Sequence, residues 1–407
     1  MKKRPANHNY LTSLTSFRGV GALLIVLGHA ESGFHIIKAI HLTDRKLYLL
    51  VDLFFILSGF VITLGYVKLF KEKITLESYR KFLWARFLRI YPLHIVILSI
   101  LAFIICAKII VENIFPGIVV APLTKNAFSF PSLISNVLLI QSWHIHQSLS
   151  WDYPSWSISC EWMAYLLFPV FAVFLKKLTR ALVLSLLAFC LIGYAELLFL
   201  SPNWVMDITY DYGVIRCLLG FCFGALLCRI YMDELPRLIT LLKSDTAFAL
   251  IAAVLIACAW FELNDLLILP LLGLLILVAS YNGGFFYRMM NRPLPQYLGK
   301  ISYSIYLVHT IILMVINGSV KLFLHKQIAD LSAIANIGLL AFYLAATLSI
   351  SGISYVLIEV KLQGYIKRIV ADMGEARKEI PAGTNIINMR IAVRNYEVPA
   401  KPKRAHV

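Results

Sequence analysis

The stretch SFRGVGALLIVLGH, residues 16 to 29, is an apolar run with an arginine near its start and a histidine at its end. With its neighbours it approaches the roughly 20 apolar residues that an α-helix needs to cross a bilayer core. Arg18 and His29 are eleven positions apart, and about 100° per residue brings them back to within about 20° of one direction. The two side chains therefore share a helix face, roughly 16 Å apart along the axis.

Ionisable side chains on one face of a spanning helix are expected to face the bundle interior or a water-filled cavity. The alternative is that Arg18 extends its charged end to the cytoplasmic interface, while His29 caps the other end of the helix. The shared face favours the first interpretation for the pair. This segment therefore predicts a functional site embedded in the membrane.

The composition extends the same conclusion to the rest of the chain. Soluble domains are close to half apolar and a quarter charged, whereas these 407 residues are 60% hydrophobic and 15% charged. Apolar runs of spanning length fall at 14–31, 47–69, 89–111, 156–175, 181–200, 211–231, 246–262, 265–281, 299–322 and 335–358. In lipid, helices satisfy their own backbone hydrogen bonds over such lengths. We predict an all-α, polytopic membrane protein with about ten transmembrane helices.

The basic residues are distributed as in a membrane protein, although the formal net charge of +16 could also suggest nucleic-acid binding. The Lys and Arg residues lie in the gaps between apolar runs, so no basic face is left to bind nucleic acid. Alternate gaps are richer in these residues, which is typical of cytoplasmic loops. The pattern predicts that both termini are cytoplasmic. A cleaved signal peptide at the start is the other interpretation, but it leaves an odd number of spans.

Further ionisable residues interrupt the later apolar runs. Asp52 lies near the start of VDLFFILSGFVI, and Glu161 lies in WSISCEWMAYLLFP. A carboxylate in such a segment needs a partner or a function, and a structural ion pair is the alternative for Glu161. Arg216 and His309 are also embedded in apolar runs. Each of these two either contacts a substrate or satisfies a neighbouring group.

Two arginines lie on one helix face at the start of the third run. Arg86 and Arg89, in WARFLRIYP, are three positions apart and therefore neighbours on a helix surface. Guanidinium groups bind phosphates through paired hydrogen bonds. The pair predicts an anion site at the cytoplasmic mouth of the bundle, with an anchor at the membrane interface as the alternative.

The sequence predicts no metal centre. His144 and His146 form a HIH pair, but no carboxylate or cysteine ligand accompanies them. The seven cysteines lie in or beside apolar runs and include no CxxC pair, so they are expected to be small buried hydrophobic residues.

Five segments, in this order, resemble the acyltransferase 3 family of integral membrane acyltransferases. They are LTSFRGVGALLIVLGHAESG, VDLFFILSGFVI, RKFLWARFLRIYPLH, SWSISCEWMAYLLFP and YLGKISYSIYLVH. The spacing of an arginine, ten residues and a histidine in the first run is a hallmark of that family, and Arg18 and His29 meet it. The resemblance covers nearly the whole chain. It corresponds to the family's stand-alone form, which lacks an additional hydrolase-like domain.

The resemblance implies that His29 is catalytic, that Asp52 and Glu161 are functionally important, and that acetyl-coenzyme A is the usual donor. A neutral histidine suits proton transfer near neutral pH. We therefore expect His29 to be the general base, with Glu161 or Asp52 orienting its ring. Arg18, Arg86 and Arg89 are expected to bind the donor phosphates, and Arg216 and His309 are further candidates for substrate binding.

The expected function is O-acetylation of a cell-surface or lipid-linked glycan, of the O-antigen or exopolysaccharide type, in the bacterial inner membrane. Acetyl-coenzyme A is then a substrate, and no cofactor is expected. Residues 1–358 are expected to form the transmembrane acyltransferase domain, and residues 359–407 a polar cytoplasmic tail. The alternative is a transporter or flippase for a lipid-linked sugar, because buried ionisable residues suit that function as well.

Overall fold

The computed structural model describes residues 9–31, 33–39, 46–70, 73–114, 127–201 and 203–370, and these residues form helices joined by turns and loops. The longer helices are α1 (Asn9–Ala30), α3 (Leu50–Tyr66), α4 (Leu76–Ile114), α6 (Trp156–Leu175), α7 (Arg180–Leu200), α8 (Gly213–Met232), α10 (Asp245–Trp260), α11 (Asp265–Tyr281), α13 (Pro293–Leu324) and α14 (Ala333–Ser354). Shorter helices are α2 (His35–Ala39), α5 (Phe130–Val137), α9 (Pro236–Leu242) and α12 (Phe285–Met290). The predicted all-α class is confirmed.

The number of membrane spans depends on whether the bent pair of helices α9 and α10 is counted as one span. Within the described residues, eight helices are long and apolar enough to cross a membrane, and α9 with α10 makes a ninth if this pair, bent by 68°, is one span. Helix α11 is apolar but has only 17 residues. Each of the ten predicted runs coincides with a helix, and the two that fall short of spanning length flank Asn264 and Asp265.

The last helix continues past the predicted domain boundary. Residues Tyr355–Leu362 form a π-helical segment at the end of α14, and helical structure runs on to residue 370. Residues 371–407 of the predicted tail lie outside the described residues. The helix that begins in the predicted transmembrane domain therefore continues into the first residues of the predicted tail.

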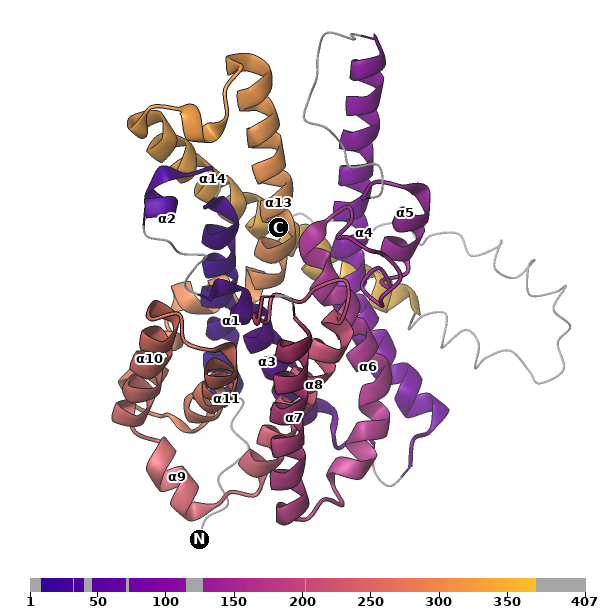
Figure 1. The fold of residues 1–407 in the computed structure, drawn as a ribbon. Coiled ribbons are helices and arrows are strands. Elements are labelled where there is room, and N and C mark those ends of the chain that lie inside the picture. The colour runs from indigo at the N-terminus through magenta and orange to yellow at the C-terminus, as the bar shows by residue number, and fades with distance from the viewer. Residues whose placement is uncertain are drawn as a thin grey trace, which may run out of the picture.

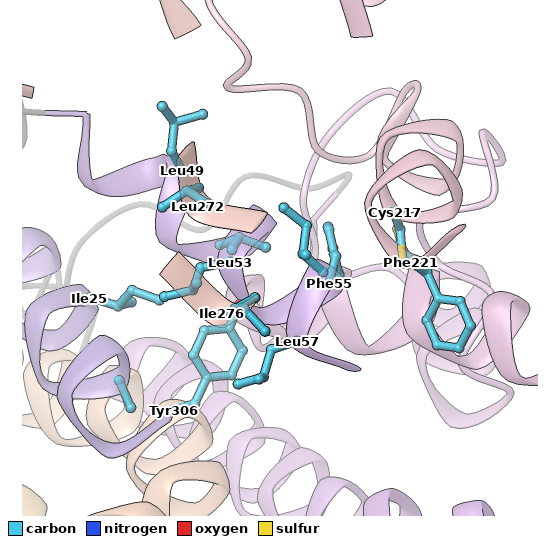
Figure 2. Close-up of a cluster of buried hydrophobic side chains, with 14 of the residues drawn as sticks. Ile25, Leu49, Leu53, Phe55, Leu57, Cys217, Phe221, Leu272, Ile276 and Tyr306 are labelled. Atoms are coloured by element: carbon cyan, nitrogen blue, oxygen red, sulfur yellow. The ribbon is translucent and has the colours of Figure 1, made fainter. Parts of the chain in front are cut away.

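Helices α1 and α3 lie near the middle of the bundle, with α9 and α10 to one side and α6 and α7 to the other (Figure 1). Buried apolar side chains from α1, α3, α8, α11 and α13 meet around α3, as Figure 2 shows. Ile25, Leu53, Leu57, Phe221 and Ile276 are all at most 6% exposed. Dispersion contacts in this cluster hold together the helices that carry the polar residues described below.

Two glycines allow α1 and α13 to approach closely. A Cβ atom on Gly19 would lie 2.6 Å from the backbone nitrogen of Gly299, and one on Gly299 would lie 2.2 Å from the carbonyl oxygen of Thr15. Small residues let helix backbones pack closely in membranes, where van der Waals contact drives association. This contact fixes the register between α1, which ends near His29, and α13, which carries His309.

Replacing Gly299 by alanine is expected to push α1 and α13 apart and to destabilise the protein by about 1–3 kcal/mol, the usual cost of overpacking. Gly318→Ala on the same helix is the matched control, because a Cβ at Gly318 meets nothing within 4 Å. Thermal unfolding of the purified proteins in detergent measures the difference. Equal midpoints for the two variants would show that the close approach is not required.

Candidate active site

A cavity that contains several charged side chains lies between α1, α3, α4, α6 and α13, and we call it the inner cavity. Its volume is about 120 Å³, and its charged lining residues are Arg18, Arg86, Arg89 and Glu161. The sequence stretches that supply these residues are far apart in the chain, so the fold brings together four of the predicted site residues.

The three arginines of the inner cavity differ in their contacts. Arg89 forms an ion pair with Glu359. Arg86 donates a hydrogen bond of 2.7 Å to the hydroxyl of Tyr66, but its buried Nε has no partner among the described residues. A buried donor without a partner is costly and marks a place where a ligand or water can bind. Arg86 therefore presents a free donor at the cavity.

The charge of the cavity favours an anion. Three guanidinium groups line it, against the carboxylate of Glu161 in the lining and that of Glu359 beside Arg89. Glu161 accepts a hydrogen bond from the hydroxyl of Ser58. In a site shielded from water, a surplus of fixed cations attracts phosphate more strongly than it would at a surface.

Asp52 and Arg216 form a buried pair away from the cavity lining. Both side chains are fully buried, and the shortest contact, between Nη2 and Oδ2, is 2.5 Å. Arg216 also donates to the carbonyl oxygens of Ile208 and Tyr48, at 2.8 and 3.0 Å. Each of the three guanidinium nitrogens of Arg216 therefore donates a hydrogen bond to a protein oxygen. Neither side chain lines the inner cavity, so we propose a structural role for the pair, while the catalytic role expected for Asp52 and the binding role expected for Arg216 stay predictions.

His29 contacts His309 instead of a carboxylate. The Nδ1 atom of His29 lies 2.8 Å from the Nε2 atom of His309, and the two rings are nearly parallel. The partner expected for His29 was Glu161 or Asp52, but Glu161 contacts Ser58 and Asp52 contacts Arg216. His309 is fully buried and is not among the lining residues of the inner cavity, and its expected role in substrate binding stays a prediction.

The hydrogen bonds of His309 determine which nitrogen of His29 is unprotonated. The Nδ1 atom of His309 lies 3.1 Å from the carbonyl oxygen of Ile305. A carbonyl only accepts, so Nδ1 of His309 carries the proton and its Nε2 accepts in the neutral ring. Nδ1 of His29 must therefore be the donor to His309, which leaves Nε2 of neutral His29 with a free lone pair. That nitrogen is available to take a proton.

The inner cavity extends to the neighbours of the histidine pair. Tyr306 and Ser157 line the cavity, and their hydroxyl groups lie 2.8 Å apart. The ring centroid of Tyr306 is 6.2 Å from that of His309. On the other side of the pair, the ring of Tyr153 packs edge-on against His29, with centroids 5.2 Å apart. Tyr306 thus connects the lining of the inner cavity to the histidine pair.

Two acidic residues near the site were not among the predicted residues. Glu359 lies in the π-helical segment, a feature that is frequent at functional sites, and accepts a hydrogen bond of 2.6 Å from Ser304. Its position directly after the last apolar run was a signal that sequence reasoning could have used. Asp152 is 1% exposed, and its Oδ1 accepts from the hydroxyl of Thr310 at 2.8 Å. Burial raises the pKa of Asp152 to about 7.

Comparison with known proteins points to the same family as the five sequence segments. Residues 11–357 match the family model for the acyltransferase 3 type of acyltransferase domain. The chain is similar to "Acyltransferase MdmB" of Streptomyces mycarofaciens, with 32% identity over 200 residues, which is 47% of this chain and 46% of that protein. It is also similar to "Protein 2 in picA locus" of Rhizobium radiobacter, with 42% identity over 98 residues, 24% of this chain and 47% of that protein.

The chain thus spans about half the length of the curated relatives it matches. No solved structure matches it. The family model, in contrast, covers the described helices from α1 to the π-helical segment. The chain therefore belongs to the acyltransferase 3 family.

Proposed function

We propose that this protein transfers an acetyl group from acetyl-coenzyme A to a hydroxyl group of a cell-surface or lipid-linked glycan in the bacterial inner membrane. The observation that carries the proposal is the inner cavity, which is lined by three arginines and by Tyr306, a neighbour of the His309 ring that contacts His29. Coenzyme A combines phosphates with a narrow thioester arm. The phosphates would contact Arg18 and Arg86, and the arm would extend toward His29.

The reaction requires a base at the attacking hydroxyl group. The hydroxyl oxygen of the acceptor attacks the thioester carbonyl carbon while Nε2 of His29 takes its proton. The C–S bond of the tetrahedral intermediate then breaks, and the thiolate of coenzyme A receives that proton from the imidazolium. The products are the acetyl ester and free coenzyme A. A positioned base of this kind contributes about 10²–10⁴-fold to the rate.

His309 acts in this mechanism as a positioning residue. By accepting from Nδ1 of His29, it holds the ring in the tautomer whose Nε2 is unprotonated. The edge-on contact with Tyr153 limits rotation of the ring. This assignment gives His309 the role that sequence reasoning gave to a carboxylate.

The donor site is tested with Arg18→Gln. Loss of a charge-assisted hydrogen bond costs about 1.5–3 kcal/mol, so the KM for acetyl-coenzyme A is expected to rise about 10- to 100-fold, with a smaller change in kcat. Arg237→Gln is the control, because Arg237 is exposed on α9. Release of coenzyme A by the purified protein in proteoliposomes measures both constants. An unchanged KM in Arg18→Gln would contradict the donor site.

A further inference from the structure

The two aromatic rings that contact His29 belong to segments far apart in the chain. Tyr153 packs edge-on against the His29 ring from the turn that precedes α6, and His309 contacts its Nδ1 atom from α13. Each has a polar neighbour in the sequence, Asp152 before Tyr153 and Thr310 after His309. The hydroxyl of Thr310 donates to Oδ1 of Asp152 at 2.8 Å. A closed chain of contacts thus runs from His29 through these four residues and back.

Asp152 lies in surroundings that disfavour a carboxyl group. Its side chain is buried, and its Oδ2 atom has no hydrogen-bond partner in the described part of the chain. Burial raises the pKa of Asp152 to about 7, so the neutral form is well populated at neutral pH. A buried polar atom without a partner is costly. The position therefore keeps an acid at a cost, and its side chain holds Thr310.

Further hydrogen bonds join the same turn to α13. The hydroxyl of Tyr306 donates to the carbonyl oxygen of Pro154 at 2.9 Å. Tyr306 lies four residues before Thr310 in α13, so the two side chains are neighbours on the helix surface. Asp152 and Pro154 stand on either side of Tyr153 in the sequence, and each is bonded to α13. Tyr153 is therefore held between two connections to the helix that carries His309.

The backbone before Asp152 is also held in place. Trp151 has a φ angle of 50°, in the left-handed region that bulky residues rarely adopt. Such conformations persist where the surrounding structure enforces them. The indole N–H of Trp151 donates to the hydroxyl of Ser132 in α5 at 3.0 Å. The chain is thus fixed to α5 at Trp151 and to α13 at Asp152.

We propose that Asp152 is a positioning residue for acyl transfer, and that its hydrogen bond with Thr310 holds Tyr153 and His309 in place on the two sides of His29. This inference rests on the proposed function and adds a residue to the same site. Asp152 acts through its neighbours and is not itself the base. Without the bond, the turn and α13 are free to separate, and Nε2 of His29 is aimed at the acceptor hydroxyl for less of the time.

Asp152→Ala and Thr310→Val each remove one side of this hydrogen bond. Both variants are expected to lower kcat by about 3- to 10-fold, the effect of one neutral hydrogen bond. The KM for acetyl-coenzyme A is expected to stay unchanged, because the donor phosphates would contact the arginines of the inner cavity. The double variant is expected to lose no more than either single variant, since effects that pass through one shared bond do not add.

Two conservative variants keep the bond and are expected to keep the wild-type kcat. In Asp152→Asn the amide oxygen still accepts from Thr310, and the side chain is neutral, as the protonated carboxyl is. Thr310→Ser retains the hydroxyl donor. Thr347→Val is the control for a buried threonine, because the hydroxyl of Thr347 in α14 is buried and has no partner among the described residues.

Release of coenzyme A by proteoliposomes measures both constants, with a surface glycan from a bacterial host as the acceptor, and kcat is expressed per folded protein. A lowered kcat in Asp152→Ala and Thr310→Val, its recovery in Asp152→Asn and Thr310→Ser, and an unchanged donor KM support the proposal. If Asp152→Ala does not fold, the comparison of Thr310→Val with Thr347→Val decides.

Three results overturn the positioning role while the proposed function stands. The first is a wild-type kcat in Thr310→Val. The second is a loss in Asp152→Asn as large as in Asp152→Ala, which would mean that the charge matters and the hydrogen bond does not. The third is a double variant in which the two losses multiply. If the wild type itself releases no coenzyme A, the proposed function fails, and the positioning role fails with it.

Discussion

Replacing His29 by alanine is expected to lower the rate of acyl transfer by about 10²–10⁴-fold, because a positioned general base contributes an effect of this size. The hydrogen bond from its Nδ1 to His309 leaves Nε2 as the proton acceptor. The KM for acetyl-coenzyme A should change little, since the donor phosphates contact the arginines. Release of coenzyme A at saturating donor measures the loss.

His35→Ala is the control for the His29 variant. His35 lies in α2, close in sequence to His29, and it is exposed. Its backbone N–H, which the substitution retains, donates to the side chain of Asn336 at 3.0 Å. We expect the His35 variant to keep the wild-type rate. A His29→Ala protein that folds and turns over at the same rate as His35→Ala would remove His29 from the chemistry.

Breaking the pair between Asp52 and Arg216 is expected to destabilise the protein by about 3–5 kcal/mol, because one buried charge is left without its partner. Asp52→Leu and Arg216→Met should each show this loss. The double variant should be more stable than either single variant, since apolar residues can replace a buried ion pair. The recovery is expected to be partial, because the carbonyl oxygens of Tyr48 and Ile208 lose the donor that Arg216 supplies.

Thermal unfolding in detergent, followed for the wild type and the three variants, measures this coupling. Ser280→Ala is a suitable control for a buried substitution, because its hydroxyl donates a hydrogen bond within its own helix, to the carbonyl oxygen of Ile276 at 2.7 Å. If Asp52→Leu unfolds at the wild-type temperature and yet loses acyl transfer, the residue has a catalytic role and the structural assignment is wrong.

Much of the fold could be predicted because the signals are local. Each apolar run is long enough to require a helix in lipid, and every predicted run coincides with one. The spacing of Arg18 and His29 placed both residues on one helix face, and the structure places Arg18 in the lining of the inner cavity and His29 against Tyr153 and His309. Arg86 and Arg89 could also be grouped from the sequence, because residues three positions apart are neighbours on a helix surface.

The pairing of side chains between distant helices could not be predicted. His29 and His309 are 280 positions apart, and Asp52 and Arg216 are 164 apart. Apolar periodicity shows that a helix forms but does not show which helices are neighbours. Sequence reasoning therefore assigned Glu161 or Asp52 to His29 as the partner of its ring. The close contact at Gly19 and Gly299, which brings α1 against α13, is the tertiary feature that decides the partner.

The bend between α9 and α10 was missed for a related reason. The two helices are separated by Lys243 and Ser244, and the side chain of Ser244 caps α10 by accepting from Ala247. A serine that caps a new helix was a usable signal. The 68° angle between α9 and α10, however, depends on packing against other helices, and it cannot be predicted from composition.

The central claim is that His29 receives the proton of an acceptor hydroxyl group during transfer of an acetyl group from coenzyme A. The most direct measurement follows radiolabelled acetyl-coenzyme A in proteoliposomes that contain the wild type or His29→Ala, with a surface glycan from a bacterial host as the acceptor. Binding of the donor to each protein is measured in parallel. The account predicts label in the glycan with the wild type alone, although both proteins bind the donor. Equal label in the glycan with both proteins would contradict it.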